Sequence, residues 1–189
     1  MELSTERCRI RPFRSTDLES LVKHADDPLV ASQLRDRFPH PYTLEAGRLF
    51  LQAIAVADPV ESFAIEVNGE VVGGVGVHPG NDVGRASAEI GYWLGREFWG
   101  RGIATVVVGA VADHLFKEAV FGRLHAHTFE GNLASQRVLE KCGFVKEGVF
   151  RKAVLKNGRL FDAVMFGRVD DAACARILQR EAERARQLS

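Results

Sequence analysis

The fold of this chain is decided by the stretch Leu94-Gly95-Arg96-Glu97-Phe98-Trp99-Gly100-Arg101-Gly102-Ile103-Ala104, which lies between a predicted strand and a predicted helix. Gly100 and Gly102 carry no Cβ atom, so the backbone there is free to turn sharply and to approach a ligand closely. The helix begins directly after them, and its free N–H groups and positive dipole end suit an anion. Arg101 and Arg96 add cationic donors. The stretch therefore predicts a cradle for a pyrophosphate group.

A tight connection between strand and helix, without any ligand, is the simplest alternative for this stretch. Two nucleotide-binding patterns fit it less well. A P-loop requires GxxxxGK followed by Ser or Thr, and no Lys-Ser or Lys-Thr follows these glycines. A Rossmann fingerprint requires GxGxxG after a first strand, and Thr105 stands where the third glycine should be.

The apolar periodicity of the remaining sequence predicts an α/β protein with a mixed sheet. Strands are expected over residues 8–12, 62–67, 71–77, 86–94, 124–128, 144–153 and 162–169, and helices over 18–26, 29–35, 44–57, 103–117 and 134–141. Thr16 and Glu19 form a predicted capping box at the first helix, and Thr43 is the predicted N-cap of the third. Asn68-Gly69 predicts a two-residue hairpin turn.

No internal repeat or linker interrupts this order, so we expect one domain over residues 1–170, followed by a helical tail over 171–189. The tail carries Arg176, Arg180 and Arg184 at four-residue steps, which place them on one face of a helix. A solvated face is the simpler expectation for these arginines, and a partner-binding helix is the alternative.

Composition and charge exclude several classes of protein. The chain has 189 residues, of which 46% are hydrophobic and 26% charged, as in an ordinary globular protein rather than a disordered one. Its 25 basic and 25 acidic residues balance, which argues against a dedicated nucleic-acid binder. The N-terminal residues contain no apolar signal segment, no apolar run is long enough to span a bilayer, and the three cysteines form no CxxC pair. We therefore expect a cytoplasmic protein that binds neither nucleic acid nor membrane.

Two motifs resemble those of a known enzyme superfamily. The runs Glu89-Ile90-Gly91-Tyr92-Trp93-Leu94 and Trp99-Gly100-Arg101-Gly102-Ile103-Ala104 resemble the acetyl-CoA motif of the GNAT superfamily. They are similar to its RimJ/RimL-like branch of ribosomal-protein-alanine N-acetyltransferases, where Trp commonly replaces the superfamily's usual Arg or Gln, as Trp99 does here. The branch's second signature resembles the stretch Asn132-Leu133-Ala134-Ser135-Gln136-Arg137-Val138-Leu139-Glu140-Lys141-Cys142-Gly143-Phe144. The matching order runs from Cys8 to Asp162.

The resemblance implies a GNAT-like fold, with a central mixed, mostly antiparallel sheet flanked by helices. It implies acetyl-CoA as the acyl donor, no metal, and direct transfer of the acetyl group to a primary amine in a ternary complex. It also implies a backbone N–H group near Leu94 that stabilises the oxyanion, at a point where the strand splays from its neighbour. The implied cofactor contacts are Trp93, Leu94, Trp99, Gly100, Arg101, Gly102, Ile103, Ala104, Thr105, Asn132 and Ser135.

Transfer of an acetyl group from a thioester to an amine needs a neutral amine, a stabilised carbonyl oxygen and a proton for the leaving sulfur. Glu89 is the expected base, because it stands in an apolar run whose desolvation would raise its pKa. The alternative is a structural carboxylate that binds neighbouring backbone or Arg85. The resemblance implies that Ser135 protonates the sulfur and that Asn132 binds the cofactor, and helix capping is the other role open to both.

Other side chains give weaker signals. His125 and His127 alternate on a strand and share a face, but no third ligand stands at a recognisable spacing, so a zinc site is not expected. His127 is an alternative base. Cys142 is expected to be buried rather than nucleophilic, because direct transfer needs no acyl-enzyme. Three aromatic residues are candidates for an acceptor pocket, with core packing as the alternative: Phe38, Tyr42 and Trp93.

The acceptor stays open between a protein N-terminus and a small amine such as an amino acid, a polyamine or a drug. Two other functions remain as alternatives: a coenzyme A-binding sensor or assembly module without turnover, and a nucleotide-binding regulator that uses the same glycine loop. A homodimer is one candidate oligomeric state.

Overall fold

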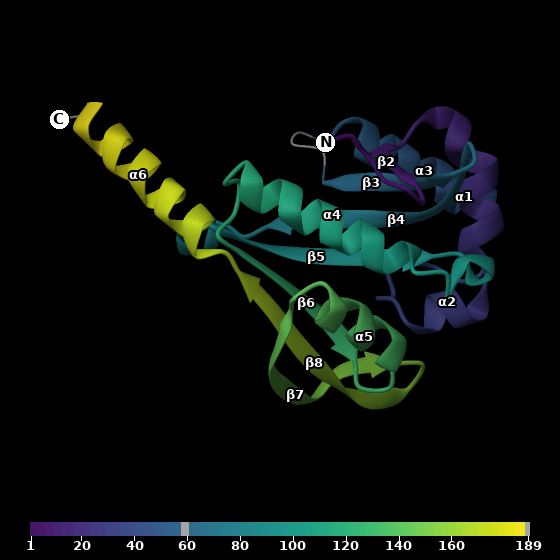
Figure 1. The fold of residues 1–189 in the computed structure, drawn as a ribbon. Coiled ribbons are helices and arrows are strands. Elements are labelled where there is room, and N and C mark those ends of the chain that lie inside the picture. Colours follow the sequence, from purple (N-terminus) through teal and green to yellow (C-terminus); the bar gives the residue numbers. More distant parts are fainter. Residues whose placement is uncertain (58–60, 188–189) are drawn as a thin grey trace.

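One mixed sheet organises the chain. The computed structural model describes residues 1–57 and 61–187, and within them eight strands pair in the order β1-β2-β3-β4-β5-β6-β8-β7 (Figure 1). The strands are β1 (Leu3–Ser4), β2 (Arg9–Pro12), β3 (Ser62–Val67), β4 (Glu70–Pro79), β5 (Ser87–Leu94), β6 (Arg123–Phe129), β7 (Val145–Lys156) and β8 (Arg159–Val169). Neighbours are antiparallel, except that β5 and β6 are parallel. The expectation of a mixed, mostly antiparallel sheet is confirmed.

Helices cover both faces of this sheet, and each face has its own apolar core (Figure 1). The helices are α1 (Leu18–Ala25), α2 (Pro28–Ser32), α3 (Leu44–Ala55), α4 (Ile103–Lys117), α5 (Leu133–Lys141) and α6 (Asp171–Gln187). On one face, α4 buries Val107 and Val111 in the main core together with Ile90. On the other face, a smaller cluster forms around Leu21 and Tyr42. Among the described residues, none of the helices has the length and apolar character that crossing a membrane requires.

Side-chain caps stabilise the N-terminal ends of α2 and α3. Thr43 caps α3 as predicted, because its hydroxyl accepts a hydrogen bond from the Ala46 N–H group at 3.2 Å. At α2, the Asp27 carboxylate accepts the Leu29 N–H group at 2.7 Å, and Pro28 occupies the first turn, where its missing N–H costs nothing. α2 ends at Ser32, so the helix predicted over 29–35 is shorter than expected.

The predicted capping box of Thr16 and Glu19 is wrong. Residues 15–17 form a short 3₁₀ turn, and α1 begins after it at Leu18. The carboxylate of Asp17 accepts the Arg14 N–H group at 2.7 Å, so the box contact forms two residues earlier in the chain than predicted. Residues 15–19 include hydroxyl and acidic side chains at more than one spacing that suits a capping box, so the sequence alone does not identify the pair that forms it.

Two hairpins connect neighbouring strands of the sheet, β3 with β4 and β7 with β8. Asn68 and Gly69 connect β3 to β4 with φ angles of 52° and 82°, the left-handed conformation of the predicted two-residue turn. The last hairpin turns at Asn157-Gly158, but its strands pair right up to that turn, so β7 and β8 are longer than the predicted 144–153 and 162–169.

β5 and β6 separate after a short contact. They pair only at Ser87 with Arg123, Ala88 with Leu124 and Glu89 with His125. Beyond Glu89, β5 keeps only β4 as its neighbour, while β6 continues along β8. The splay near Leu94 that the family resemblance implied is therefore present, and it leaves a wedge-shaped opening in the sheet.

The C-terminal helix α6 leaves the end of β8 beside the C-terminal end of α4 and then extends away from the body (Figure 1). Arg176 donates to the Phe116 carbonyl at 2.7 Å. Arg180 donates to the carbonyls of Ala119 at 3.1 Å and Glu118 at 3.2 Å. Both residues are exposed, as expected of a solvated arginine face, and their guanidinium groups also donate to carbonyl groups at the negative end of α4.

Replacing Arg180 with alanine should reduce the free energy of unfolding by about 1 to 2 kcal/mol, because two carbonyl groups lose a charged donor. Arg184 provides the matched control, since its guanidinium is exposed and, among the residues that the structure describes, its ion pair is with Glu181 at 3.4 Å. Arg184→Ala should change stability by less than about 0.5 kcal/mol. Denaturant unfolding of the two variants measures both values, and equal values would show that Arg180 does not anchor α6.

Candidate active site

A cleft of about 1620 Å³ runs through the opening between β5 and β6. Its walls include the first turn of α4, the start of α5, the segment 33–38 after α2, and part of β7. Most of the predicted cofactor residues line it: Trp93, Leu94, Trp99, Gly100, Gly102, Ile103, Ala104, Thr105, Asn132 and Ser135. Neither predicted cationic donor lines it. The guanidinium of Arg101 lies over the Phe98 ring at 5.1 Å, and Arg96 is exposed outside the cleft.

The glycine turn leaves a set of backbone amides facing open space. Gly100 and Gly102 have φ angles of 72° and 75°, which favour glycine, and a Cβ atom on either would meet no protein atom within 4 Å. The first intrahelical bond of α4 runs from the Val106 N–H group to the Gly102 carbonyl, so the N–H groups of residues 103–105 have no partner within the helix. Within residues 1–57 and 61–187, no side-chain hydrogen bond caps this end. An anion fits the position on physical grounds.

Trp99 fixes this turn against the end of β5. Its indole Nε1–H donates to the carbonyl of Leu94 at 2.8 Å. The backbone of the turn is thereby held beside the opening in the sheet.

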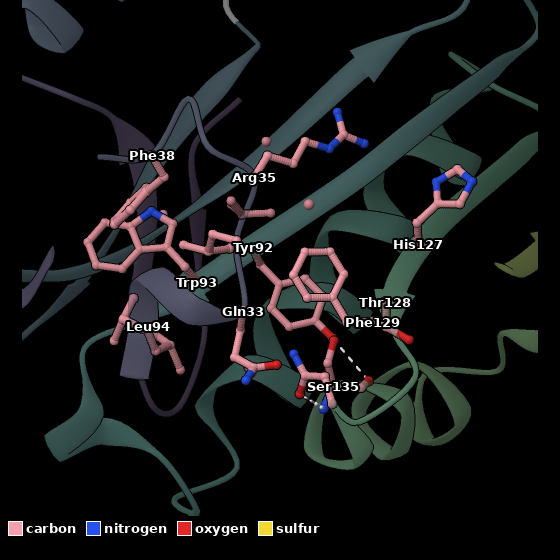
Figure 2. Close-up of a pocket in the computed structure, with 18 of the residues that line it drawn as sticks. Gln33, Arg35, Phe38, Tyr92, Trp93, Leu94, His127, Thr128, Phe129 and Ser135 are labelled. Carbon is pink, nitrogen blue, oxygen red and sulfur yellow. Dashed lines mark hydrogen bonds between the residues drawn. The ribbon is translucent and has the colours of Figure 1, made fainter. Parts of the chain in front are cut away.

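Two hydroxyl groups meet where β5 faces α5. The Oγ atom of Ser135 lies 2.8 Å from the Oη atom of Tyr92, and the Ser135 carbonyl lies 3.2 Å from the same Oη (Figure 2). Asn132 caps α5, because its Oδ1 accepts the Ser135 N–H group at 3.1 Å. Burial raises the pKa of Tyr92 well above its usual range. The capping role considered for Asn132 is confirmed, and the pairing with Tyr92 has no signal in the sequence.

Glu89 lies in the cleft beside Arg35 and His127. Its carboxylate binds the guanidinium of Arg35, and its Oε1 is 3.6 Å from Nδ1 of His127. Burial raises the pKa of Glu89, but the hydrogen bond and charge of Arg35, with smaller contributions from His127 and His125, outweigh burial and lower it. The expected raised pKa is therefore wrong in direction. The partner considered from sequence, Arg85, instead pairs with Glu181 at 3.0 Å.

Comparison with known proteins identifies the family. Residues 7–145 match the acetyltransferase (GNAT) domain. The chain belongs to the GNAT acetyltransferase family. It is 32% identical over 170 residues to the uncharacterized N-acetyltransferase p20 of Bacillus licheniformis, covering 87% of this chain and 93% of that protein. This GNAT chain is thus an N-acetyltransferase, an enzyme that uses acetyl-CoA, and a binding module without turnover is not supported.

Solved structures show the same fold. A GNAT-family acetyltransferase from Bacillus anthracis superposes with a TM-score of 0.79 at 25% identity, over 89% of this chain and 98% of that one. RimL, a ribosomal L7/L12 alpha-N-protein acetyltransferase in complex with coenzyme A, gives 0.78 at 21% identity, over 91% and 99%. The second likeness concerns the fold alone.

Two remaining candidates, His125 and Cys142, are not among the residues that line the cleft. The Nδ1 atom of His125 is 3.3 Å from the Ser87 hydroxyl, and burial lowers the pKa of this histidine. No group of three metal-ligating side chains occurs among the described residues. Cys142 is buried, its thiol donates to the Thr105 carbonyl at 3.2 Å, and burial raises its pKa, as suits a packing residue.

The three aromatic candidates for an acceptor pocket belong to the smaller core and also line the cleft. Tyr42 is 4% exposed and forms part of the smaller core. The rings of Phe38 and Trp93 lie 5.3 Å apart in an edge-to-face contact at one end of the cleft (Figure 2). Tyr42 lines the cleft as well, so both packing and pocket lining apply to all three residues.

Proposed function

We propose that this GNAT enzyme transfers the acetyl group of acetyl-CoA directly to a primary amine, in a ternary complex. The observation that carries the proposal is the single cleft that joins three groups: the free amides of residues 103–105, the Ser135 hydroxyl and the Glu89 carboxylate. These supply an anion site, a proton donor and a proton acceptor, which are the groups that acetyl transfer to an amine needs.

The donor end fits coenzyme A. The space beside Gly100 and Gly102 is empty of protein atoms, and the amides of residues 103–105 would hold the pyrophosphate there. Thr128 is 4% exposed, lines the cleft, and its Oγ1 has no hydrogen-bond partner among the described residues. An unsatisfied buried hydroxyl is costly, so a polar group of a ligand would stabilise it. When bound, acetyl-CoA supplies the thioester carbonyl that the amine attacks.

The acceptor end lies on the other side of the sheet. Side chains alternate along β5, so Glu89 and Trp93 face away from the α4 core toward which Ile90 and Leu94 point. An α-amine has an unperturbed pKa of about 7.7–8.0, so a carboxylate and water suffice to remove its proton near neutral pH. In this proposal Glu89 receives that proton, directly or through water, and Phe38 and Trp93 contact the body of the acceptor.

Intact-mass measurement of products tests the function. The enzyme is incubated with acetyl-CoA and a panel of peptides and small amines, while release of free thiol is followed in parallel. Acetylated product together with thiol release is expected for at least one amine. Neither product nor amine-dependent thiol release across α-amines, lysine-like amines and polyamines would contradict the proposal.

The pH dependence of kcat/KM tests the part played by Glu89. Arg35 lowers the pKa of Glu89 against the opposing effect of burial, so Arg35→Ala should raise that pKa. The acid limb of the profile follows the free enzyme's base, and we expect it to move to higher pH. Arg37 is the control, because it lies in the same segment but contacts His78 at 3.3 Å. An unmoved limb in Arg35→Ala would remove Glu89 as the base.

A further inference from the structure

The hydrogen bond that Tyr92 donates affects whether the hydroxyl proton of Ser135 is available to a ligand. A phenol carries one proton, and Tyr92 Oη has two acceptors within reach, the Ser135 carbonyl at 3.2 Å and the Ser135 Oγ at 2.8 Å. If Tyr92 donates to the carbonyl, the 2.8 Å contact between the two hydroxyls requires Ser135 to donate to Tyr92 Oη. The Ser135 proton is then not available to a ligand. If Tyr92 donates to Oγ, which is the shorter contact, the Ser135 proton is free for a ligand in the cleft.

Serine alone is a poor acid for this reaction. A model thiol has a pKa of about 8.5 and a phenol of about 10, whereas an aliphatic alcohol is a far weaker acid than either. A serine that protonated the sulfur without help would be left as an alkoxide, a much stronger base than the thiolate it had neutralised. A phenol in contact with the serine oxygen reduces this difficulty, because the charge then ends on a phenolate, which is a weaker base than an alkoxide.

We propose that Tyr92 and Ser135 act as a proton relay, in which Tyr92 gives Ser135 the proton that Ser135 passes to the leaving sulfur. The proposal rests on the proposed function of the site. As the carbon–sulfur bond breaks, its electron pair goes to sulfur. The Ser135 O–H bond breaks and an S–H bond forms, while the Tyr92 proton moves to Ser135 Oγ. The phenolate then regains a proton from water, which balances the proton that the amine loses.

Two opposing effects act on the Tyr92 phenol. Burial raises its pKa, which keeps the phenol protonated throughout the neutral range but makes it a weaker acid than a phenol in water. The hydrogen bond with Ser135 acts in the opposite direction and stabilises the phenolate. The Ser135 backbone is held independently by the Asn132 cap, so loss of the phenol hydroxyl leaves the start of α5 in place.

A double-mutant cycle is the first test. Tyr92→Phe should lower kcat about tenfold and leave the dissociation constant of coenzyme A within about twofold, since the proton is needed chiefly in the transition state. Ser135→Ala should lower kcat further. The double variant should be no slower than Ser135→Ala, because the two hydroxyls serve one transfer. Unchanged kcat in Tyr92→Phe, or effects that multiply in the double variant, would overturn the relay.

A second readout does not depend on turnover. The chain has two tyrosines, so a Tyr42→Phe background leaves Tyr92 as the single site for biosynthetic labelling with difluorotyrosine, whose more acidic phenol titrates at lower pH. Fluorine NMR then follows the phenol. Ser135→Ala in this background should shift its pKa upward, because the phenolate loses a hydrogen-bond donor. An unshifted pKa would overturn the relay. An enzyme that acetylates no amine would instead contradict the proposed function, and this titration would still be readable.

Discussion

Replacing Gly102 with valine is expected to abolish coenzyme A binding, with a loss of at least about a hundredfold in affinity, or about 2.7 kcal/mol. Gly102 is the residue before α4, with φ at 75°, and its Cβ position opens into space free of protein atoms. A branched side chain there would fill the approach to the amides of residues 103–105. Loss of several hydrogen bonds to a charged group, at about 1.5 to 3 kcal/mol each, accounts for the size of the effect. Isothermal titration calorimetry with coenzyme A measures it.

Gly69 supplies the matched control for this variant. It has a φ of 82° in the turn between β3 and β4, and a Cβ atom there also meets nothing within 4 Å. Valine at either position therefore carries a similar backbone strain of about 1 to 3 kcal/mol. Gly69→Val should lose stability and keep its affinity for coenzyme A. Retained affinity in folded Gly102→Val would show that the glycine turn is a simple connection and not a pyrophosphate site.

Replacing Ser135 with alanine should lower kcat by a factor on the order of 10² to 10³, the range expected when a proton donor is lost. The KM for acetyl-CoA should change much less, because the hydroxyl acts mainly in the transition state. The Ser135 N–H group still donates to Asn132 in the alanine variant, so α5 keeps its cap. Steady-state kinetics with a productive amine measures both parameters.

Comparing Asn132→Ala with Ser135→Ala separates the effect of the α5 cap on stability from the effect of the Ser135 hydroxyl on catalysis. Asn132→Ala removes the acceptor that caps α5 and should cost about 0.5 to 2 kcal/mol of stability, whereas Ser135→Ala should cost little. Thermal unfolding of both variants gives this contrast. Equal kcat in Ser135→Ala and the parent enzyme would remove Ser135 from the mechanism, whatever the effect of Asn132→Ala.

Local features of the fold could be predicted from the sequence. The hairpin at Asn68-Gly69, the Thr43 cap and the glycine turn before α4 depend on neighbouring residues and on backbone angles that few residue types adopt. The apolar spacing of α4 likewise marks its buried face. These features, together with the two motifs, were enough to predict the mixed sheet and the family, and most of the residues singled out as cofactor contacts line one cleft.

Contacts between distant segments could not be predicted. Arg35 and Glu89 stand 54 positions apart, and their ion pair reverses the expected direction of the Glu89 pKa. Tyr92 and Ser135 are 43 positions apart, so the motif that contains each gives no sign of the other. Residue type and spacing describe one segment at a time, and a pKa or a proton path depends on all charges and hydroxyls within a few ångströms.

The sequence indicated where the chain turns, which faces of its helices are apolar, and that α4 begins directly after a glycine turn. Contacts between distant residues appear only in the folded chain: Arg35 binds Glu89, Tyr92 contacts Ser135, and Arg180 donates to carbonyl groups at the end of α4. The physical reason is the range of the interactions. Backbone preferences act over a few neighbouring residues, whereas electrostatic and hydrogen-bond partners are chosen when the strands and helices pack together.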